Sequence, residues 1–264
     1  MKILGVIPAR GGSKSILRKN IKLFAGQPLI YYSILQARES KYINRCIVTT
    51  DDEEIRDISK QFGAEVPFLR PKEISGDLST DLEFFQHLLQ WIHDNEPENM
   101  PDILVQLRPT YPTRDVKIID ECIQKFIDNP GCDCVRTVAL YEGKTPFKMY
   151  RLGEMNGIGE LNEIGELNEI GELNKFEKNN KTTILNPLFN EVDGLKEPYN
   201  LPRQCLPDVY IANGYIDVIS PNTILEKKSV GGDITVPYIM DSSYIDDIDT
   251  IEEWKQIENN FLNK

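Results

Sequence analysis

The sequence predicts an α/β fold built on a mostly parallel sheet, and two observations support this prediction. Short apolar runs alternate with segments of helical periodicity through the first half of the 264 residues. This alternation is typical of βαβ units, whose sheets are covered by helices on both faces. With 40% hydrophobic residues, the chain is long and apolar enough to bury a substantial core.

The predicted elements follow one another as strand, helix and strand. Strands are expected at 2–8, 44–49, 64–68, 102–107 and 133–139, and helices at 28–39, 52–62, 80–95 and 115–128. Regular structure returns at 208–219 and 233–240, and a last helix is expected to begin near Asp249. Ligands of such folds bind at the carboxyl ends of the strands, which is where the segment 10–19 is expected to lie.

A hexapeptide repeat interrupts this pattern from Gly153 to Asn174, in the copies GEMNGI, GELNEI, GELNEI and GELN. A Gly at every sixth position weakens a helix, and Leu and Ile three residues apart would face opposite sides of a strand. We therefore expect 153–174 to be an expansion in a loop or hairpin tip, without an amphipathic strand and without chemistry of its own. The polar stretch 175–201 continues this region.

Composition excludes several classes of function. The net charge of −12 disfavours nucleic acid as a partner, because phosphate-backbone binding needs an extended basic face. No apolar run approaches a membrane span and no apolar leader precedes a cleavage site, so neither a membrane partner nor export is expected. Five cysteines without framework spacing predict reduced thiols and a cytoplasmic location. Cys132 and Cys134 lack a second pair at zinc-site spacing, which favours small core residues over metal ligands.

The motif IPARGGSKSILRKN (7–20) follows the first apolar run and combines two glycines with a cluster of cations. Gly11 and Gly12 let backbone N–H groups approach a ligand closely, and the cations would offset its negative charge. The basic residues are Arg10, Lys14, Arg18, Lys19 and Lys22. A polyphosphate fits this combination, although neither the Walker A pattern nor Gly-x-Gly-x-x-Gly is present. The alternative is a Gly-Gly turn with solvated Lys and Arg.

Six motifs in order resemble the acylneuraminate cytidylyltransferases, which are the CMP-sialic acid synthetases and relatives acting on other nonulosonic acids. They are IPARGGSKSILRKN, FLRPKEISGDLS (68–79), LRPTYPTR (107–114), TPFK (145–148), PRQCLPDVYIANG (202–214) and SYIDDIDT (243–250). The resemblance implies a Rossmann-like nucleotidyltransferase core at 1–142 and 206–264, with a smaller dimerisation excursion at 143–205. It implies a homodimer that transfers CMP from CTP to an acidic sugar with Mg²⁺, releasing pyrophosphate, for surface glycan biosynthesis.

The same resemblance implies roles for individual residues. Those implied for nucleotide binding are Arg10, Gly11, Gly12, Lys14 and Lys19 at the triphosphate and Asn20, Arg70 and Ser79 at the cytidine. Those implied for the acceptor are Arg108, Lys148, Arg203 and Asn213. Asp247 and Asp249 match the family's metal-binding Asp-x-Asp, and with Arg10 and Lys19 they form the implied catalytic set. Such types suit nucleotidyl transfer, which needs positioning and charge neutralisation more than covalent catalysis.

Two of these assignments have alternatives from the residues alone. Asp249 also opens a capping-box-like pattern with Glu252, so it is expected to serve as the N-cap of the last helix as well as a metal ligand. Lys148 and Arg203 would, without the resemblance, be surface residues.

Departures from the family concern the acceptor. Arg108 stands where sialic acid synthetases have Gln, and Ile211 stands where the family often has Arg; Leu17 replaces a common Pro and Asp217 a common aromatic residue. A guanidinium at position 108 favours a carboxylate, a phosphate or a differently oriented acid; a salt bridge to a nearby acid is the structural alternative. Two other functions therefore stay open: a nucleotidyltransferase acting on a sugar phosphate or other phosphorylated acceptor, and an inactive nucleotide-binding relative.

Overall fold

The computed structural model describes residues 1–156, 160–163, 182–241 and 247–263. The chain divides into two compact units. The larger unit consists of Met1–Ala139 with Ile211–Lys264, and the smaller unit is Leu140–Tyr210. The excursion expected at 143–205 falls within the smaller unit, and its role in dimerisation stays a prediction.

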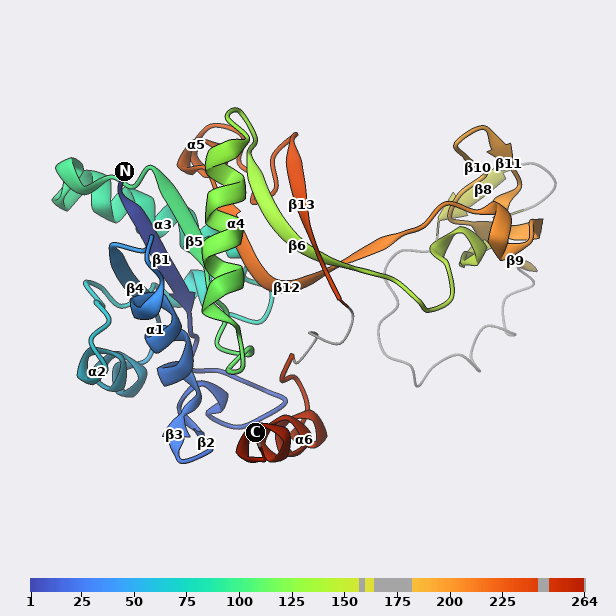
Figure 1. The fold of residues 1–264 in the computed structure, drawn as a ribbon. Coiled ribbons are helices and arrows are strands. Elements are labelled where there is room, and N and C mark those ends of the chain that lie inside the picture. Colours follow the sequence, from blue (N-terminus) through green and yellow to red (C-terminus); the bar gives the residue numbers. More distant parts are fainter. Residues whose placement is uncertain (157–159, 164–181, 242–246, 264) are drawn as a thin grey trace. The chain divides into compact units, whose positions relative to one another are not determined.

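A six-stranded sheet forms the centre of the larger unit (Figure 1). Its strands are β1 (Ile3–Pro8), β4 (Arg45–Thr49), β5 (Ile103–Gln106), β6 (Cys134–Leu140), β12 (Tyr210–Ile219) and β13 (Thr235–Met240), in the spatial order β13-β6-β12-β5-β1-β4. β1 is parallel to β4 and to β5, and β6 is parallel to β13, whereas β12 is antiparallel to β5. The predicted α/β fold with a mostly parallel sheet is confirmed.

Helices cover both faces of this sheet. The side chains of α1 (Leu29–Glu39), α2 (Glu53–Gln61) and α4 (Val116–Asp128) belong to one core cluster, and those of α3 (Asp81–Asn95) and α5 (Pro221–Leu225) belong to the other. Successive residues of β1 alternate between the clusters: Ile3 and Ile7 join the first, and Leu4 and Val6 join the second. Burial on both faces explains why the strands are continuous apolar runs in the sequence.

The last helix, α6 (Ile251–Leu262), packs beside a short hairpin of β2 (Leu23–Phe24) and β3 (Gln27–Pro28), with the rings of Phe24 and Trp254 5.7 Å apart. Its N-cap is Thr250, which forms a capping box with Glu253. The expectation that Asp249 is the N-cap is therefore wrong. Thr-x-x-Glu fits the box because the hydroxyl accepts from the N–H of Glu253 while the Glu253 carboxylate accepts from the N–H groups of Asp249 and Thr250.

The order of the strands creates a switch point beside β1. The chain passes from β1 through α1 to β4 on one side, and later returns through α3 to β5 on the other side. The loops that follow β1 and β5 therefore separate at the carboxyl ends of these strands, which is where open α/β sheets bind ligands. The segment 10–19 and Arg108 lie on these two loops.

One predicted strand is absent from the described residues. The segment 64–68 makes a single bridge between Glu65 and Ile47 and no longer ladder. Pro67 has no N–H to donate, so pairing beside β4 cannot continue past it. The chain then turns toward Arg70, whose N–H donates to the carbonyl oxygen of Thr50 at 2.7 Å.

In the smaller unit, β7 (Tyr150–Asn156), β8 (Glu160–Glu163) and β9 (Thr182–Pro187) form an antiparallel sheet, and β10 (Glu191–Val192) pairs with β11 (Leu195–Lys196). Gly153 is paired with Glu163, so the first repeat copies form two strands of a hairpin. We expected a loop or hairpin tip without an amphipathic strand. The residues 153–156 and 160–163 are themselves paired strands, because backbone pairing does not require an amphipathic pattern. The rest of the repeat, 164–174, lies outside the described residues.

All five cysteines are free thiols, and Cys132 and Cys134 are buried, as expected for small core residues. Burial raises the pKa of Cys134 to about 12. Within the described ranges, no cluster of three or more His, Cys, Asp or Glu side chains is arranged to hold a metal. Among the helices of these same ranges, none combines the length and apolarity needed to cross a membrane.

Candidate active site

A hollow of about 460 Å³ lies at the switch point of the larger unit. The predicted residues that line it are Arg10, Lys14, Lys19, Asn20, Arg70, Ser79, Arg108 and Asp249. Gly11, Gly12, Asp247 and Asn213 belong to the structure around it. The larger unit thus brings most of the expected nucleotide residues together with Arg108 and Asp249, and these lining residues come from four separate stretches of the chain.

The two glycines of the first loop have different surroundings. A Cβ atom on Gly11 would lie 2.8 Å from Asp52 Oδ2, and the N–H of Gly11 donates to Asp51 Oδ1 at 2.9 Å. Gly11 is therefore required by close packing against the loop after β4. No described atom lies within 4 Å of a Cβ built on Gly12, so its backbone is open to a ligand.

Carboxylates pair with the cations of the loop. Arg10 Nη1 donates to the carbonyl oxygen of Gly76 at 2.7 Å and lies 3.2 Å from Asp77 Oδ1, and Lys14 also pairs with Asp77. Lys14 lowers the pKa of Asp77, with Arg10 adding to the effect. The carboxylate of Asp77 thus lies between Arg10 and Lys14, the two side chains expected to bind phosphate.

Arg18 holds the other end of the loop. It adopts a left-handed φ of 57° and pairs with both oxygens of Asp52, and its Nη2 also donates to Glu54 at 2.5 Å. Asp52 is in turn the N-cap of α2, and the hydrogen bond from Arg18 lowers its pKa. These contacts of Arg18 fix the loop to the structure around β4 and α2.

The three residues expected at the cytidine are partly engaged by the protein. Arg70 is buried over the ring of Phe84 at 5.3 Å and donates to Thr49 Oγ1 at 3.1 Å, and burial lowers its pKa. Asn20 Nδ2 donates to the carbonyl oxygen of Arg10 at 2.9 Å, and Ser79 Oγ accepts from the N–H of Gly76 at 2.9 Å. These contacts shape the wall of the hollow.

Asp247 and Asp249 differ in environment. Asp249 is exposed and lies 3.1 Å from Lys19 Nζ, whereas Asp247 is half-buried and its Oδ1 has no hydrogen-bond partner among the described residues. Burial raises the pKa of Asp247, and the charge of Asp249 adds to this. Two neighbouring carboxylates, of which Asp247 has an oxygen without a hydrogen-bond partner in the described part of the chain, are ligands that suit Mg²⁺. This ion takes one or two carboxylates together with water and phosphate oxygens.

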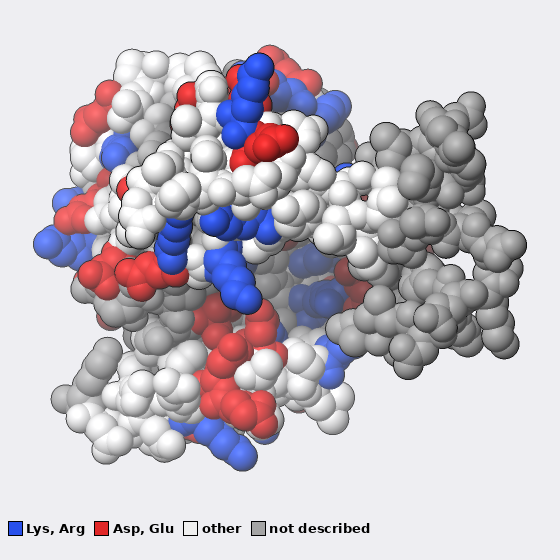
Figure 2. All heavy atoms as spheres, turned by 90° about the vertical axis from the view of Figure 1, so that its right-hand side faces the viewer, with Lys and Arg blue, Asp and Glu red and all other residues white. Residues whose placement is uncertain are grey.

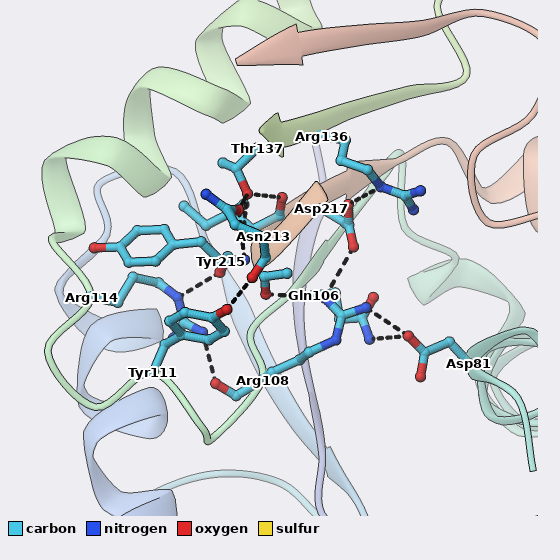
Figure 3. Close-up of polar contacts among 12 residues, drawn as sticks. Asp81, Gln106, Arg108, Tyr111, Arg114, Arg136, Thr137, Asn213, Tyr215 and Asp217 are labelled. Carbon is cyan, nitrogen blue, oxygen red and sulfur yellow. Dashed lines mark hydrogen bonds and ion pairs between the residues drawn. The ribbon is translucent and has the colours of Figure 1, made fainter. Parts of the chain in front are cut away.

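Arg108 is the centre of a polar network (Figure 3). Its Nη2 donates to Asp81 Oδ2 at 2.7 Å, and its Nη1 lies 3.1 Å from both Asp217 Oδ2 and the carbonyl oxygen of Gly214. The salt-bridge alternative therefore holds, and Arg108 still lines the hollow. Nearby, Arg114 donates to the carbonyl oxygens of Tyr215 and Arg108 at 2.8 and 2.7 Å, and burial lowers its pKa to about 10.

The other expected acceptor residues do not line this hollow. Asn213 is buried, and its Oδ1 accepts from Thr137 Oγ1 at 2.6 Å, so its amide holds β12 against β6. Lys148 and Arg203 line a separate hollow of about 510 Å³ within the smaller unit, together with Lys144.

Two contributors to the site were not foreseen from the sequence. Asp77 and Asp81 follow the buried Arg70 within or just after the motif 68–79. The sequence does not show which cations these acidic residues pair with, because the pairing depends on how the chain folds. On the face shown in Figure 2, blue Lys and Arg side chains are interspersed with red Asp and Glu side chains.

A profile of the cytidylyltransferase family matches residues 4–151. The chain belongs to this family. It is 38% identical over 129 residues to the pseudaminic acid cytidylyltransferase of Campylobacter jejuni, covering 49% of this chain and 55% of that protein. It is 29% identical over 257 residues to the CMP-N,N'-diacetyllegionaminic acid synthase of Campylobacter jejuni, covering 97% of this chain and 94% of the relative. The resemblance predicted from the motifs is thus confirmed.

The fold is also that of a solved enzyme structure. The chain superimposes with a TM-score of 0.63 on a CMP:2-keto-3-deoxy-manno-octonic acid synthetase complexed with CTP, covering 100% of this chain and 99% of that chain at 14% identity. This similarity concerns the fold. Among the sequence relatives, the chain spans about half the length of the first curated proteins that it matches.

Proposed function

We propose that the protein is a cytidylyltransferase that transfers CMP from CTP to an acidic sugar, a nonulosonic acid or related acid, for surface glycan biosynthesis. The observation that carries the proposal is the hollow at the switch point, where Arg10, Lys14 and Lys19 belong to the same lining as Asp249 and Lys19 contacts Asp249. Cations and carboxylates placed in this way serve nucleotidyl transfer better than simple binding, because a binding module has no need of carboxylates near a polyphosphate.

In the proposed reaction a hydroxyl oxygen of the acceptor forms a bond to the α-phosphorus of CTP. The bond from that phosphorus to the bridging oxygen breaks, pyrophosphate leaves with the electron pair, and the hydroxyl proton passes to solvent. Arg10, Lys14 and Lys19 hold the leaving pyrophosphate and neutralise its charge. Arg70, Asn20 and Ser79 shape the place for the cytidine.

Asp247 and Asp249 are the residues that would hold Mg²⁺. The unpartnered Oδ1 of Asp247 and the closeness of a second carboxylate support this assignment. When bound, the ion supplies positive charge to the phosphate oxygens. Lys19 contacts Asp249 and so keeps the exposed carboxylate at the edge of the hollow.

We further propose that Lys148 and Arg203 bind the acid group of the acceptor from the partner copy of a homodimer. The support is their shared hollow in the smaller unit, where Lys144 adds a third cation. Arg108 completes the acceptor side from the larger unit. The five free thiols support a cytoplasmic location for the reaction.

The second candidate, a nucleotidyltransferase for phosphorylated acceptors, rested on the charge of Arg108. Asp81 and Asp217 compensate that charge, which argues against a phosphate at this position.

Pyrophosphate release tests the proposal directly. The full chain is incubated with Mg²⁺ and CTP, UTP, ATP or GTP, each with N-acetylneuraminate, pseudaminic acid, N,N'-diacetyllegionaminic acid or a sugar 1-phosphate. Release with CTP and one of the acids is expected, and CTP should give the largest thermal stabilisation of the four nucleotides. Turnover only with another nucleotide would overturn the cytidylyl assignment, and turnover only with a sugar 1-phosphate would overturn the assignment of an acidic sugar as acceptor. Binding without turnover would indicate an inactive relative.

A further inference from the structure

Four charged side chains form an alternating row from the sheet to the hollow (Figure 3). Arg136 Nε donates to Asp217 Oδ1 at 2.6 Å, and Arg108 lies between Asp217 and Asp81. Asp217 is 2% exposed, whereas the side chain of Asp81 is 39% exposed and lines the hollow. Two cations and two anions leave the row without net charge.

This arrangement limits what Arg108 can bind. Three of its five N–H groups are engaged by Asp81, Asp217 and the carbonyl oxygen of Gly214. An incoming carboxylate or phosphate would meet the charge of Asp81 beside the guanidinium and be repelled. The remaining N–H groups are therefore suited to neutral oxygen acceptors.

Asp81 presents the complementary chemistry. Its Oδ2 accepts from both Arg108 Nη2 and Gln106 Nε2, the latter at 2.9 Å, while its Oδ1 has no hydrogen bond within the described part of the chain. Gln106 Oε1, buried beside it, also lacks a partner there. Asp81 is held at the first position of α3 by the capping box of Thr80 and Glu83. This corner thus offers fixed acceptors beside a fixed donor, which matches hydroxyl groups.

We propose that Asp81 is a specificity-determining residue whose Oδ1 accepts a hydrogen bond from a hydroxyl group of a sugar ring bound in the hollow, with Arg108 as the adjacent donor. Arg136 and Asp217 are positioning residues that hold Arg108 in place. The inference rests on the proposed function for the presence of a sugar in the hollow. The ring is either the ribose of the nucleotide or the acceptor sugar, and the two are distinguished by experiment.

The test uses the full chain and three carboxylate-to-amide variants: Asp81→Asn, Asp217→Asn and, as a control, Asp133→Asn. In Asp81→Asn the amide oxygen is drawn to Arg108 and Gln106, so the NH₂ group replaces Oδ1 and cannot accept from a hydroxyl. Asp133 is a tightly bonded carboxylate outside the lining of the hollow. Calorimetry with Mg²⁺ measures binding of CTP, 2′-deoxy-CTP and 3′-deoxy-CTP, and of the three nonulosonic acids named above in the presence of α,β-methylene-CTP, which cannot release pyrophosphate.

A hydrogen bond to a charged group predicts a change of about 10- to 100-fold. If the hydroxyl is on the ribose, the preference for CTP over one deoxy-CTP falls by this factor in Asp81→Asn, and acid binding is unchanged. If it is on the acceptor, acid binding weakens and the CTP preference is unchanged. Asp217→Asn changes the same one of the two measurements, the CTP preference or the acid binding, by a smaller factor. Asp133→Asn changes neither measurement.

Two results would overturn the inference. Tighter acid binding in Asp81→Asn would identify Arg108 as an anion site that Asp81 normally blocks. An unchanged CTP preference together with unchanged or undetectable acid binding would make Asp81 part of the scaffold. Absence of pyrophosphate release with every acid, combined with a lost preference for CTP over deoxy-CTP, would count against the proposed function and leave the role of Asp81 standing.

Discussion

Lys19 Nζ lies 3.1 Å from Asp249 Oδ1 and donates to the carbonyl oxygen of Ile248 at 2.9 Å, so side chains 230 positions apart meet at the rim of the hollow. The basic loop after β1 and the segment before α6 are thereby joined. A cation proposed for the leaving pyrophosphate thus directly contacts a carboxylate proposed for Mg²⁺. Binding of the metal and the nucleotide is expected to rearrange this pair.

Asp249→Asn is expected to lower turnover by roughly 10²-fold or more with the fold retained, because it removes a charge that acts in the transition state. The helix should be unaffected, since Thr250 and not Asp249 is its N-cap. Steady-state kinetics with Mg²⁺ and thermal unfolding measure the two effects.

Thr250→Ala is the matched control for this change. It should cost about 1 kcal/mol of stability through loss of the cap, with turnover close to that of the parent. Normal turnover of Asp249→Asn with Mg²⁺ would leave Asp249 without a role in the metal site.

If the sugar hydroxyl beside Arg108 belongs to the acceptor, Arg108→Gln should raise the acceptor KM and leave the apparent affinity for CTP almost unchanged. It removes one of two partners of the buried Asp217, so it should also lower stability. Combined with Asp217→Asn, the two stability changes should be non-additive by about 0.5–3 kcal/mol. Chemical unfolding of the parent protein, the two single variants and the double variant measures this double-mutant cycle. Equal increases in the KM of CTP and of the acceptor would place Arg108 in the scaffold alone.

Asp77→Asn is expected to tighten binding of CTP and of pyrophosphate by about 2- to 5-fold, the factor set by exposed ion pairs. Its carboxylate pairs with Arg10 and Lys14 and competes with phosphate for them. Calorimetric titration at two salt concentrations should show that the difference shrinks at high salt. Weaker binding by the variant would mean that Asp77 helps to form the site.

Removal of one hexapeptide, 165–170, should leave turnover within a few-fold, because it leaves the paired segments 153–156 and 160–163 in place. The longer deletion, Gly159 to Ile170, brings the copy Gly-Glu-Leu-Asn at 171–174 to the position of 159–162 and should behave alike. Kinetics and the oligomeric state of both variants are the measurements. A collapse of activity or of the oligomer in the shorter deletion would show that the repeat has a structural role.

Stability should fall at acidic pH through Asp133. Its hydrogen bond from Lys227, with the backbone N–H groups of Ile234 and Asp233, lowers its pKa to about 2. Because this is below the unfolded value of about 3.9, the stabilisation is present above pH 4 and is lost as the pH falls toward 2. Urea unfolding between pH 5 and 2 should show a weaker pH dependence in Asp133→Asn. An identical slope in both proteins would contradict this account.

Local signals in the sequence specify the alternation of strands and helices in the larger unit. β1, α1, α3 and β5 begin and end within one or two residues of the predicted bounds. These elements depend on local signals, namely continuous apolar runs and the polar residues that cap a helix, which are present in the chain before it folds. The expected nucleotide loop at 10–19 also follows from local features, since it directly follows a strand and contains Gly-Gly.

Tertiary contacts were needed to account for the absent strand at 64–68, the strands inside the repeat and the pairing of Arg108 with Asp217. A strand forms only when a partner satisfies its N–H and C=O groups: Pro67 ends the pairing beside β4, whereas β7 is paired with β8 and with the more distant β9. Arg108 and Asp217 are 109 positions apart, and their charges meet because β5 and β12 are neighbours in the sheet. Contacts of this kind depend on the order of the strands, which local periodicity does not specify.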